Sequence, residues 1–584
     1  MTPLRMNPLP TCNSRLAWRR AAFGSVPELL DYSAGGETGI SFYNVRGEIL
    51  STLSWREVQG RAHVVARRLI GAGFARGERL LITADTWPGF FDLFFGAQYA
   101  GLLPVPVSIP VGVGGKDAYL EQLRRQLTAS GAVAALGLDD LAGFLAEAAV
   151  EAPTVRLHGG MSALEALPEK PVDLRPLGRE ELCYIQFSSG STRHPHGVQI
   201  TQRALMANLA GITGPAGLDV QAGDRAASWL PLYHDMGLIG FLLSPLAAQL
   251  SIDYLTPRDF ARRPAQWLNL ISRNRCTIAY SPSFGYDLAA RRAATQVSTD
   301  LDLSCWRHAG IGGDMIRPDV LERFAETFAP AGFDAKAFIP SYGMAEVCLA
   351  ITFGPHDHGA RIDEVDRVAL AEHQHAQPVT SGERHRGRRF VLCGKTLPGH
   401  ELQVRGTDGQ VLADREVGRI FVKGPSIMPG YFAEPAATRE VLSDDGWLDT
   451  GDLGYMLDGE IVVTGRAKDL IIVNGRNIWP QDIEWAIEAR RAVKSGDAAA
   501  FSIDTTDGER VVVAVLARVS GEEARQALAR DVAGAVREMV AVDCDVVLVP
   551  PTLGLPTTSS GKLSRARAKA NYLAGLYSPK TAAA

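Results

Sequence analysis

Four short segments of this chain gather residue types that bind phosphate or stabilise charge, and they follow one another in a fixed order. They are FSSGSTRHPHGV at 187–198, SYGMAE at 341–346, DTGD at 449–452 and TSSGK at 558–562. They supply a hydrogen-bonding cradle, a carboxylate for a metal ion, a carboxylate for ribose hydroxyls and a mobile cation. One such segment would be weak evidence, but the four together predict the transfer of AMP from ATP to a carboxylate.

The segment 187–198 is predicted to be a loop that cradles phosphate groups. Gly190 lets the backbone approach a phosphate, and hydroxyl and amide groups donate hydrogen bonds without adding fixed charge. The hydroxyl donors and the one cation of the loop are Ser188, Ser189, Ser191, Thr192 and Arg193. The spacing is not that of a Walker A loop, which needs Gly-Lys followed by Ser or Thr. A flexible surface loop could have the same composition, and only the partner segments favour phosphate binding.

Two acidic residues are candidates for holding other parts of a nucleotide. Glu346 would hold Mg²⁺ through a carboxylate oxygen, the ligand type that phosphate-bound Mg²⁺ prefers. The flat ring of Tyr342, in the same segment, would cover a purine. Asp452 ends a segment that we expect to be a tight turn, where its carboxylate can accept both ribose hydroxyls. Either acid could instead be a solvated, capping or turn-forming residue, which is the commoner role.

Lys562 and His234 complete the catalytic candidates. Lys562 lies in a Ser- and Gly-containing loop that also lacks Walker spacing. A lysine that enters the site can neutralise charge developing between a carboxylate and the α-phosphate, and such groups are typically worth about 10²–10³ in rate. A solvated lysine in a basic tail is the alternative. His234, within WLPLYHDM at 229–236, is interpreted as a gate on the substrate side, although core histidines are commoner at apolar segments.

The overall composition is that of an ordinary globular enzyme. The chain has 584 residues, of which 46% are hydrophobic and 21% charged, and a formal net charge of −5. These values argue against nucleic-acid binding and extended disorder. The seven cysteines include no C-x-x-C pair, which favours reduced thiols in a cytoplasmic protein. A group of irregularly spaced histidines is interpreted as a solvated loop rather than a zinc site; it comprises His356, His358, His373, His375 and His385.

No integral membrane segment is expected. The amino terminus lacks the continuous apolar core of a signal peptide. The two most apolar stretches, 89–111 and 238–252, are interrupted by Asp92, Gln98, Gln249 and several prolines. A helix that spans a bilayer needs about 20 largely apolar residues. We therefore interpret both stretches as buried strands and helices.

Through the first two thirds of the chain, apolar runs typical of buried strands alternate with helical periodicity. A helix at 55–72 precedes a strand at 79–83, and a strand at 181–187 precedes a helix that Thr201 would cap, at 201–212. This alternation predicts an α/β fold with parallel sheets that helices cover on both faces.

From about residue 388 the pattern changes to short strands and turns, as in a small β-barrel or hairpin array. Strands are predicted at 389–393, 401–404, 419–422 and 460–463. A compact α/β unit then begins with a strand at 470–473, a turn at 474–475 and a helix near Pro480. We predict a large domain over 1–464, β-rich over 388–464, then a hinge at 465–469 and a C-terminal domain over 470–584.

These segments resemble those of the acyl-adenylate-forming superfamily, which includes acyl-CoA ligases and nonribosomal-peptide adenylation domains. Within it the chain is most similar to the fatty acyl-AMP ligases. The residues that carry this resemblance are PVPVSIP at 104–110, WLPLYHDMG at 229–237, GRAKDLIIVNGRN at 465–477 and PQDIE at 480–484. The resemblance implies a large N-terminal domain of two flavodoxin-like αβαβα subdomains with a distorted β-barrel, followed by a small mobile α+β C-terminal domain, or lid.

The resemblance also implies roles for individual residues. Residues 188–193 would cradle the triphosphate of ATP, Glu346 and Thr192 would hold Mg²⁺, and Asp452 would bind the ribose. Lys562 would be the lysine of the adenylation step, and Lys468 or Asp469 would be the hinge residue. The remaining implied nucleotide contacts are Gly312, Gly313, Asp314, Ser341, Tyr342, Gly343, Met344, Arg466 and Lys468.

Other expectations follow from the same resemblance. His196 stands where many relatives have lysine, and GGDM at 312–315 replaces the more usual GAEP, so the nucleotide affinity stays open. Residues 347–392 fall where fatty acyl-AMP ligases carry an insertion that restrains the lid and disfavours transfer to CoA. An acyl tunnel is implied near Trp229, Met236 and 280–284. A basic tail could face an acidic carrier protein or simply be solvated; it comprises Lys562, Arg565, Arg567 and Lys569.

The expected reaction has two steps. A fatty-acid carboxylate attacks Mg·ATP, which gives an acyl-adenylate and pyrophosphate. The lid then rotates, and the acyl group passes to the phosphopantetheine thiol of a holo acyl carrier protein or of a carrier domain in a polyketide, nonribosomal-peptide or lipid pathway. A fatty acyl-CoA ligase with the same first step is the alternative. A nucleotide-binding regulatory protein without catalysis is a third hypothesis, disfavoured by the intact Glu346, Asp452 and Lys562.

Overall fold

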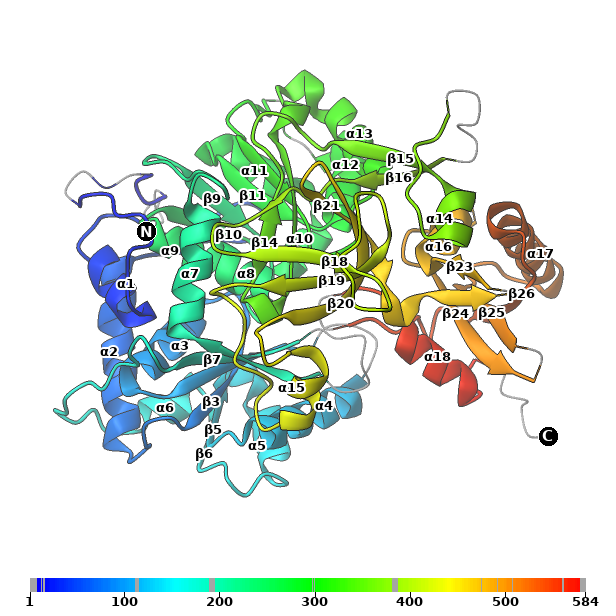
Figure 1. Ribbon diagram of the computed structural model, residues 1–584. Helices are drawn as coiled ribbons and strands as arrows, with labels where there is room; N and C mark the ends of the chain where they lie inside the picture. Colours follow the sequence, from blue (N-terminus) through cyan, green and yellow to red (C-terminus); the bar gives the residue numbers. More distant parts are fainter. Residues whose placement is uncertain are drawn as a thin grey trace.

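The computed structural model describes residues 8–577, apart from 12, 14–15, 111–114, 189–194, 297, 299, 381–386, 474, 491, 507 and 559–560 and the side chains of 294–296. Figure 1 shows a large body, coloured blue to yellow along the chain, and a smaller C-terminal unit, coloured orange to red, beside it. No helix in these described ranges is long and apolar enough to cross a membrane.

A four-stranded parallel sheet lies within the blue and cyan part of the large body in Figure 1. Its strands are β3 (Arg79–Thr83), β4 (Leu103–Val107), β5 (Ala134–Gly137) and β6 (Leu157–Gly160). They lie in the order β4-β3-β5-β6 and every neighbouring pair is parallel. Counted along the chain this order is 2-1-3-4, which is that of flavodoxin-like sheets.

Alternate residues of these strands pack on opposite layers of helices. Leu80 and Ile82 join the cluster that contains α2 (Trp55–Gly71) and α3 (Pro88–Ala100). Leu81 joins a separate cluster with side chains of α4 (Gly115–Ser130) and α5 (Ala142–Ala149). Both faces of the sheet are therefore buried, which explains why its strands read as continuous apolar runs. Within α3 all residues from Gly89 to Ala100 are buried, so this apolar stretch is a core helix.

A nine-stranded sheet is the second α/β layer of the large body. Its central strands, in spatial order, are β10 (Ser251–Tyr254), β9 (Arg225–Ser228), β11 (Ile278–Ser281), β12 (His308–Ile311) and β13 (Phe338–Gly343). They are all parallel, and their chain order is 2-1-3-4-5, which confirms the second flavodoxin-like subdomain. Beyond β1 (Gly39–Tyr43), which pairs in parallel with β10, and beyond β13, the edges differ from the prediction of parallel sheets, because the strand pairs there are antiparallel. The remaining edge strands are β2 (Ile49–Ser54), β14 (Ala350–Phe353) and β17 (Lys395–Thr396).

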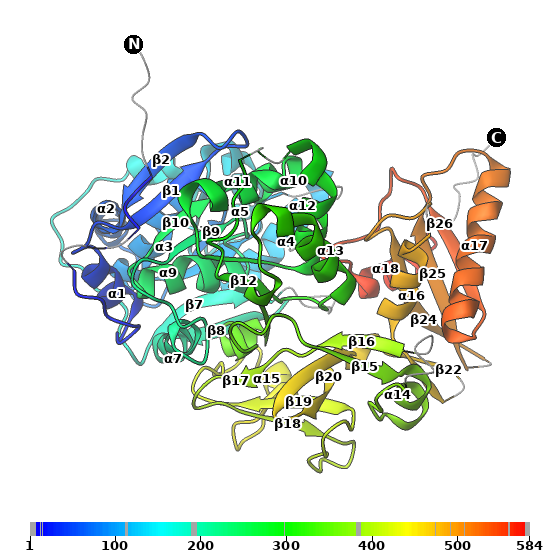
Figure 2. The same ribbon diagram turned by 90° about the horizontal axis from the view of Figure 1, so that it is seen from above.

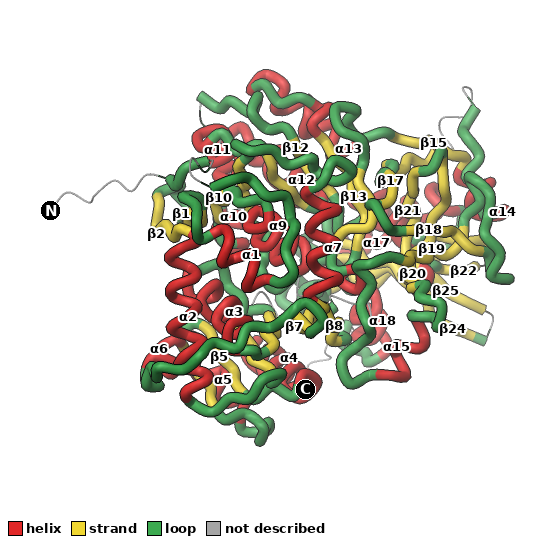
Figure 3. Tube along the Cα trace, turned by 60° about the vertical axis from the view of Figure 1, so that its left-hand side comes forward, coloured by secondary structure: helices red, strands yellow, loops and turns green. Residues whose placement is uncertain are grey.

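A hairpin and a helix follow at the junction of the two subdomains. The hairpin consists of β7 (Leu182–Phe187) and β8 (Gly197–Thr201), and β7 packs beside β4. The hydroxyl of Thr201 accepts a hydrogen bond from the Ala204 N–H, so it caps α7 (Gln202–Thr213) as predicted. Figure 3 shows α7 standing beside α9 (Ser244–Ala247) and α1 (Val26–Ser33).

The β-rich region is an antiparallel sheet in the order β18-β19-β20-β21. Its strands are β18 (Glu401–Arg405), β19 (Gly418–Lys423), β20 (Leu448–Leu457) and β21 (Glu460–Arg466). Backbone hydrogen bonding continues beyond β21, because the Cys393 N–H donates to the Ile461 carbonyl at 2.8 Å and the Ile461 N–H donates to the Gly394 carbonyl at 3.0 Å. A separate hairpin, β15 (Ile362–Asp366) and β16 (Gly387–Val391), precedes it, together with α14 (Arg367–His373).

The C-terminal unit has its own hydrophobic core on both faces of the sheet β24-β25-β26. Its elements after β22 (Ile471–Val473) and β23 (Arg476–Ile478) are α16 (Pro480–Glu488), β24 (Ala498–Thr505), β25 (Gly508–Leu516), α17 (Glu522–Val540), β26 (Cys544–Val549) and α18 (Arg565–Leu573). Along β25, Val511, Val513 and Val515 pack towards α16 and α17. The intervening Val512 and Ala514 pack towards α18, as the two-residue period of a strand requires.

Candidate active site

A cavity of about 350 Å³ lies at the carboxyl ends of the parallel strands of the nine-stranded sheet. The loop after β9 brings His234 to its wall, β11 brings Tyr280, and the loop after β12 brings Gly313. Ligands of open α/β sheets bind at this edge, next to the point where the strand order reverses, which here lies between β9 and β11. The topology alone therefore marks this cavity as a ligand site.

All four sequence segments reach this cavity. The predicted site residues that line it are Ser188, His234, Gly313, Ser341, Tyr342, Gly343, Met344, Glu346, Asp452, Arg466, Lys468 and Lys562. They come from both the large body and the C-terminal unit. Gly312 and Asp314 are not on this wall, although Asp314 lines a neighbouring cavity.

The ends of the predicted phosphate loop are at the cavity, but its centre lies outside the described residues. This applies to Ser189, Gly190, Ser191, Thr192 and Arg193. Ser188 and His196 close the loop at its base, since the Ser188 N–H donates to the His196 carbonyl at 2.9 Å. The His196 N–H in turn donates to the Ser188 hydroxyl oxygen at 3.2 Å. The hairpin β7–β8 thus presents the loop towards the cavity.

Glu346 is a buried carboxyl group on the cavity wall, with 8% of the residue exposed. The Tyr431 hydroxyl donates to its Oε1 at 3.0 Å. Burial raises the pKa of Glu346, while this hydrogen bond and the charge of Arg466 oppose the rise. In the described part of the chain no three His, Cys, Asp or Glu side chains converge as metal ligands. A cation at Glu346 would therefore take its other ligands from phosphate oxygens and water, as Mg²⁺ commonly does.

A strained turn follows Glu346. Cys348 has φ 62° and ψ −69°, and the Leu349 N–H donates to the Val347 carbonyl at 2.8 Å. This is a γ-turn in the left-handed half of the map, a rare conformation for a residue with a side chain. Such strain costs about 1–3 kcal/mol and is concentrated at functional sites. The γ-turn reverses the chain sharply between Glu346 and Leu349, and both of these residues line the cavity.

The buried Tyr342 and the half-buried Asp452 form a pair between β13 and β20. The Tyr342 hydroxyl donates to Asp452 Oδ2 at 2.8 Å, and Arg466 Nε lies 3.5 Å from Oδ1. Burial raises the pKa of Asp452, and Arg466 and Tyr342 counteract this rise. The segment is not the tight turn that we expected: it lies within β20, where a register shift against β19 and the positive φ of Gly451 (74°) bulge the strand. The bulge is possible because glycine tolerates this φ.

Lys562 enters the site from the C-terminal unit. Its Nζ donates to the Gly313 carbonyl, and the residue lines both this cavity and the neighbouring one. The preceding residue, Gly312, packs tightly against β13. A Cβ at this position would lie 2.6 Å from the Ser341 carbonyl oxygen. Close packing of the loop after β12 against β13 therefore requires glycine at 312.

His234 begins the short helix α8 (Asp235–Leu238) and lies on the cavity wall. Its Nδ1 is 2.6 Å from Asp235 Oδ1 and accepts a hydrogen bond from the Met236 N–H at 3.4 Å, so this ring nitrogen is engaged within the turn. Burial alone would raise the pKa of Asp235, but His234 and Lys562 outweigh it, so the pKa is lowered. With Nδ1 held in this way, Nε2 is the imidazole atom that remains for a ligand.

One arm of the cavity is apolar. Its lining residues include Ile212, Leu218, Gly240, Phe241, Leu349 and Phe353. Gly240 and Phe241 belong to a π-helical turn (Ile239–Leu243), a feature often found at functional sites. Of the residues expected in an acyl tunnel, Met236 and Tyr280 line the cavity. Trp229 does not, because its ring is stacked on Phe260 at a centroid distance of 3.8 Å.

A second cavity of about 190 Å³ lies between the large body and the C-terminal unit. It borders the first one at residues that line both, which are Gly313, Ser341, Tyr342, Gly343, Asp452, Arg466 and Lys562. Its remaining wall includes Asp314, Met315, Ile316, Phe390, Val391 and Gln481. The two cavities thus form one continuous site with a polar centre.

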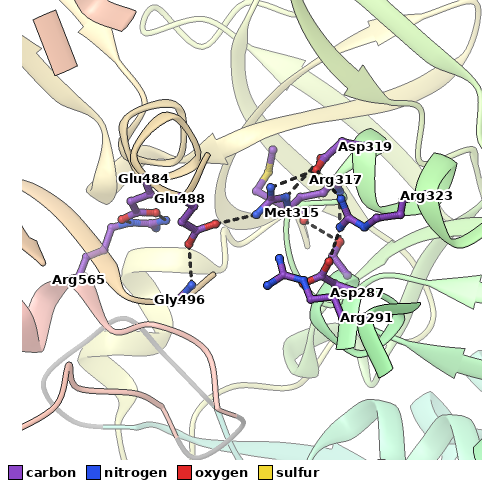
Figure 4. A network of polar contacts seen from close by, with 11 residues as sticks. Asp287, Arg291, Met315, Arg317, Asp319, Arg323, Glu484, Glu488, Gly496 and Arg565 are labelled. Carbon is purple, nitrogen blue, oxygen red and sulfur yellow. Dashed lines mark hydrogen bonds and ion pairs between the residues drawn. The ribbon is translucent and has the colours of Figure 1, made fainter. Parts of the chain in front are cut away.

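Two expectations about charged residues were wrong. Arg565 is not part of a free basic tail, because it donates to Asp469 at 2.7 Å and to Glu484 at 2.7 Å. Figure 4 shows Arg565 beside Glu484. The histidine group does not form one solvated loop: His356 is half-buried and its Nε2 contacts the Gly217 carbonyl at 2.6 Å, whereas His373 ends α14. His385 lies outside the described residues.

Sequence reasoning missed the residues that support the site. Tyr431 holds Glu346, and its ring stacks on that of His196 at a centroid distance of 4.6 Å. His196 Nδ1 lies 2.7 Å from Glu434 Oε2. Tyr431 and Glu434 lie outside all four motif segments, in the connection between β19 and β20. Their contribution could not be read from local spacing, because it depends on a contact between distant parts of the chain.

Comparisons with known proteins agree with this geometry. The family of AMP-binding enzymes matches residues 42–432. A Caulobacter vibrioides protein, provisionally named an acyl-CoA synthetase, is 48% identical over 97% of this chain and 98% of its own length. The medium-chain fatty acid–[acyl-carrier-protein] ligase JamA of Moorena producens is 30% identical over 95% of this chain and 96% of its own length.

A solved structure extends the similarity to three dimensions. It comes from a study of fatty acyl-adenylate ligases of E. coli and L. pneumophila, is 42% identical and superimposes with a TM-score of 0.91. The match covers 96% of this chain and 99% of that one. With the family spanning most of the chain and the fold shared along its whole length, this protein belongs to the AMP-binding, adenylate-forming enzymes and is a ligase of the fatty acyl-AMP ligase type.

Proposed function

We propose that this ligase activates a fatty acid with ATP and passes the acyl group to the phosphopantetheine thiol of an acyl carrier protein. In the first step a carboxylate oxygen attacks the α-phosphorus of ATP, and the bond from that phosphorus to the bridging oxygen of the β-phosphate breaks. Pyrophosphate leaves and an acyl-adenylate remains. In the second step the thiol sulfur attacks the acyl carbonyl, AMP leaves, and the thiol proton passes to water.

One observation carries this proposal: Lys562 of the C-terminal unit meets Asp452, Glu346 and the base of the phosphate loop around a single cavity. These groups come from distant parts of the chain and supply opposite charges. A cation at the centre and carboxylates around it suit a ribose triphosphate and an attacking carboxylate. The apolar arm beside them, with Ile212 and Phe353, suits a hydrocarbon chain, since each buried methylene contributes about 0.8 kcal/mol.

Each polar residue then has a distinct task. Lys562 stabilises the negative charge that develops between the carboxylate and the α-phosphate in the transition state. Such electrostatic stabilisation is usually the largest single contribution to the rate. Asp452, held by Tyr342, accepts the ribose hydroxyls. Arg466 and Lys468 contact the phosphates from the end of β21 and the segment after it. His234 presents Nε2 to the carboxylate side of the cavity as a gate.

Glu346 is the residue that fits a magnesium ion. Its carboxylate is buried, lines the cavity and keeps an oxygen available beside the one that Tyr431 contacts. We assign the ion to Glu346 and to Thr192 of the phosphate loop, together with phosphate oxygens. Bound there, Mg²⁺ would neutralise the charge of the departing pyrophosphate.

For the second step we propose that residues 470–584 move as a lid about a hinge at 465–469, relative to a large domain over 1–464. The separate core of the C-terminal unit supports this division. The segment 347–392 contacts the lid: Arg388 Nε lies 2.9 Å from Asp482 Oδ1, and Arg476 Nε lies 3.5 Å from Glu372 Oε1. In Figure 2, α14 lies next to β22 of the C-terminal unit. These contacts support a restraint on rotation of the lid and hence on transfer to free CoA.

A fatty acyl-CoA ligase is the second candidate. The 48% identity to the Caulobacter protein named for acyl-CoA synthesis favours it, whereas the identity to JamA favours the carrier protein. The first step is the same in both. The two candidates differ only in the thiol that receives the acyl group.

Mass spectrometry of the products distinguishes these possibilities. The enzyme is incubated with Mg·ATP and a panel of fatty acids, with either CoA or a phosphopantetheinylated carrier protein. We expect acyl-AMP that persists with CoA and disappears into acyl-carrier protein. Efficient acyl-CoA formation would instead support the second candidate, and no acyl-AMP with any acid would contradict the proposed first step.

A further inference from the structure

Gln481 places an unpaired hydrogen-bond acceptor at the second cavity. The residue lies in the first turn of α16, is 6% exposed and lines this cavity. Among the described residues its buried Oε1 has no hydrogen-bond partner. Buried amide oxygens in folded proteins are almost always paired, and an unpaired one costs stability unless a ligand or water completes it. Because Gln481 lines the cavity, rotation of its terminal amide would bring this unpaired acceptor to a donor on a ligand there.

The amide of Gln481 lies beside the end of β21. A Cβ built on Gly465 would be 3.6 Å from Gln481 Nε2, which places the amide next to Arg466 and the hinge segment. Other polar side chains on this part of the wall are already engaged. Arg565 is paired with Asp469 and Glu484, and the Ser341 hydroxyl donates to the Ile311 carbonyl at 3.3 Å.

The arrangement of the two cavities decides which part of ATP reaches Gln481. A ribose at Asp452 lies on their common border. The first cavity continues from there towards Ser188 and Glu346, which suit phosphates, and towards its apolar arm. The adenine base therefore belongs in the second cavity. There Tyr342, Phe390 and the backbone at Gly313 provide flat surfaces for an aromatic ring.

We propose that Gln481 binds the 6-amino edge of adenine and selects ATP by that group; this inference rests on the proposed function. A carboxamide offers an acceptor and a donor side by side, and this pair matches the amino group and the adjacent ring nitrogen of adenine. Adenine's amino group is the only strong donor on the base. The remaining hydrogen-bond donors of the nucleoside are the ribose hydroxyls, which donate to Asp452.

The position of Gln481 on the lid gives this contact a second consequence. Because α16 belongs to the C-terminal unit, the contact with the base exists only while that unit lies as in this structure, with Lys562 in the site. Binding of adenine and this lid position therefore stabilise each other, and the coupling is equal in both directions. ATP itself helps to hold the lid in place for the first step.

The test compares ATP with purine riboside triphosphate, which lacks the 6-amino group, in the wild type and in Gln481→Met. Methionine keeps a similar length but has no strong acceptor. We expect the wild type to prefer ATP by about tenfold or more in kcat/KM for acyl-AMP formation. In Gln481→Met this preference should disappear, because kcat/KM falls more for ATP, which loses both contacts, than for purine riboside triphosphate, which loses only the contact to the ring nitrogen.

Controls separate this role from a purely structural one. Gln526→Met changes an exposed glutamine on α17, which contacts Glu522 at 3.0 Å, and should keep the wild-type preference. Gln481→Glu retains an acceptor and should keep most of the preference for ATP even if the methionine variant folds poorly. The increase in melting temperature that a nucleotide causes should drop from the wild type to Gln481→Met by more for ATP than for purine riboside triphosphate.

A preference for ATP that survives in Gln481→Met, or its absence from the wild type, would overturn the inference while leaving the proposed function intact. Failure of the wild type to form acyl-AMP with any fatty acid and ATP would overturn both. The two failures are therefore distinguishable in the same experiment.

Discussion

Arg317 Nη1 and Glu488 Oε2 lie 2.7 Å apart and join the loop after β12 to helix α16, as Figure 4 shows. The side chains are 19% and 8% exposed, and the Arg317 guanidinium also lies over the Trp485 ring at 5.2 Å from its centroid. Gly313 of the same loop accepts a hydrogen bond from Lys562. The C-terminal unit therefore contacts this loop at both ends, through Lys562 at one and through the ion pair at the other.

Removing this ion pair should impair the adenylation step. We expect Arg317→Met and Glu488→Gln each to slow fatty-acid-dependent ATP–pyrophosphate exchange. The double variant should be less impaired than the sum of the two, with a coupling of about 0.5–3 kcal/mol, because Arg317→Met leaves the buried Glu488 carboxylate without its cation, whereas Arg317 keeps its pair with Asp319 in Glu488→Gln. Exchange rates of the four proteins give this coupling directly.

A matched control for this cycle is the pair Arg389–Glu322, whose side chains are 38% and 48% exposed and both belong to the large body. Its coupling should fall within about 0–1 kcal/mol, as for exposed pairs in general. Strictly additive effects at Arg317 and Glu488 would contradict the coupling between loop and lid.

Tyr431→Phe should move the acidic limb of the pH–rate profile to higher pH. Burial raises the pKa of Glu346, and the hydrogen bond from Tyr431 lowers it towards the ordinary value. Without this hydrogen bond the pKa rises further. If the ionised carboxylate is needed, activity falls as pH drops through that pKa, so the fall begins at a higher pH in the variant.

Tyr455→Phe is the control for this shift. The Tyr455 hydroxyl donates to Asp363 Oδ2 at 2.7 Å, a similar buried pair that does not line the cavity. Its pH–rate profile for pyrophosphate exchange should match the wild type. An unchanged acidic limb in Tyr431→Phe would exclude the role assigned to Glu346.

Two glycine substitutions should have opposite effects on stability. In Gly312→Ala the new Cβ would lie 2.6 Å from a backbone oxygen of β13, which cannot move freely. We expect a loss of about 1–3 kcal/mol, as for overpacked cores, and weaker ATP binding. In Gly534→Ala nothing lies within 4 Å of the added atom, in the middle of α17. Here we expect a gain of about 1 kcal/mol from helix propensity. Chemical denaturation measures both, and equal effects would contradict this account.

Arg565→Met should destabilise the C-terminal unit by about 3–5 kcal/mol, because it leaves the carboxylates of Glu484 and Asp469 without their cation. Arg567→Met, on the exposed side of the same helix, should change stability by less than about 0.5 kcal/mol. Thermal unfolding compares the two. Similar small effects would mean that the buried cluster does not support α18.

The parts of the fold that local periodicity specifies could be predicted from sequence. The strand at Arg79–Thr83 and the cap at Thr201 were correct because both depend on neighbouring residues. The antiparallel edges of the large sheet were missed, since strands such as β14 and β17 pair across a long insertion. The bulge at Asp452 was taken for a turn, because Asp-Thr-Gly-Asp has turn composition and only pairing with β19 makes it a strand.

The candidate site was predicted where motifs are contiguous, and missed where a contact joins distant segments. Glu346 and Lys562 could be found from their own loops. Tyr431 and Glu488 could not, because their partners lie far away in the sequence. Arg565 looked like part of a basic tail until the structure placed two carboxylates beside it. Which charged side chains pair with each other depends on the tertiary structure, and the composition of a segment does not reveal it.

Exchange of labelled pyrophosphate into ATP, in the presence and absence of fatty acid, tests the central claim most directly. The wild type should exchange label only with fatty acid, and Lys562→Ala should lower the rate by about 10²–10³ without changing the melting temperature. Lys569→Ala, in the helix α18 that follows Lys562, should behave like the wild type. No fatty-acid-dependent exchange in the wild type, or near-normal exchange in Lys562→Ala, would contradict the adenylation mechanism.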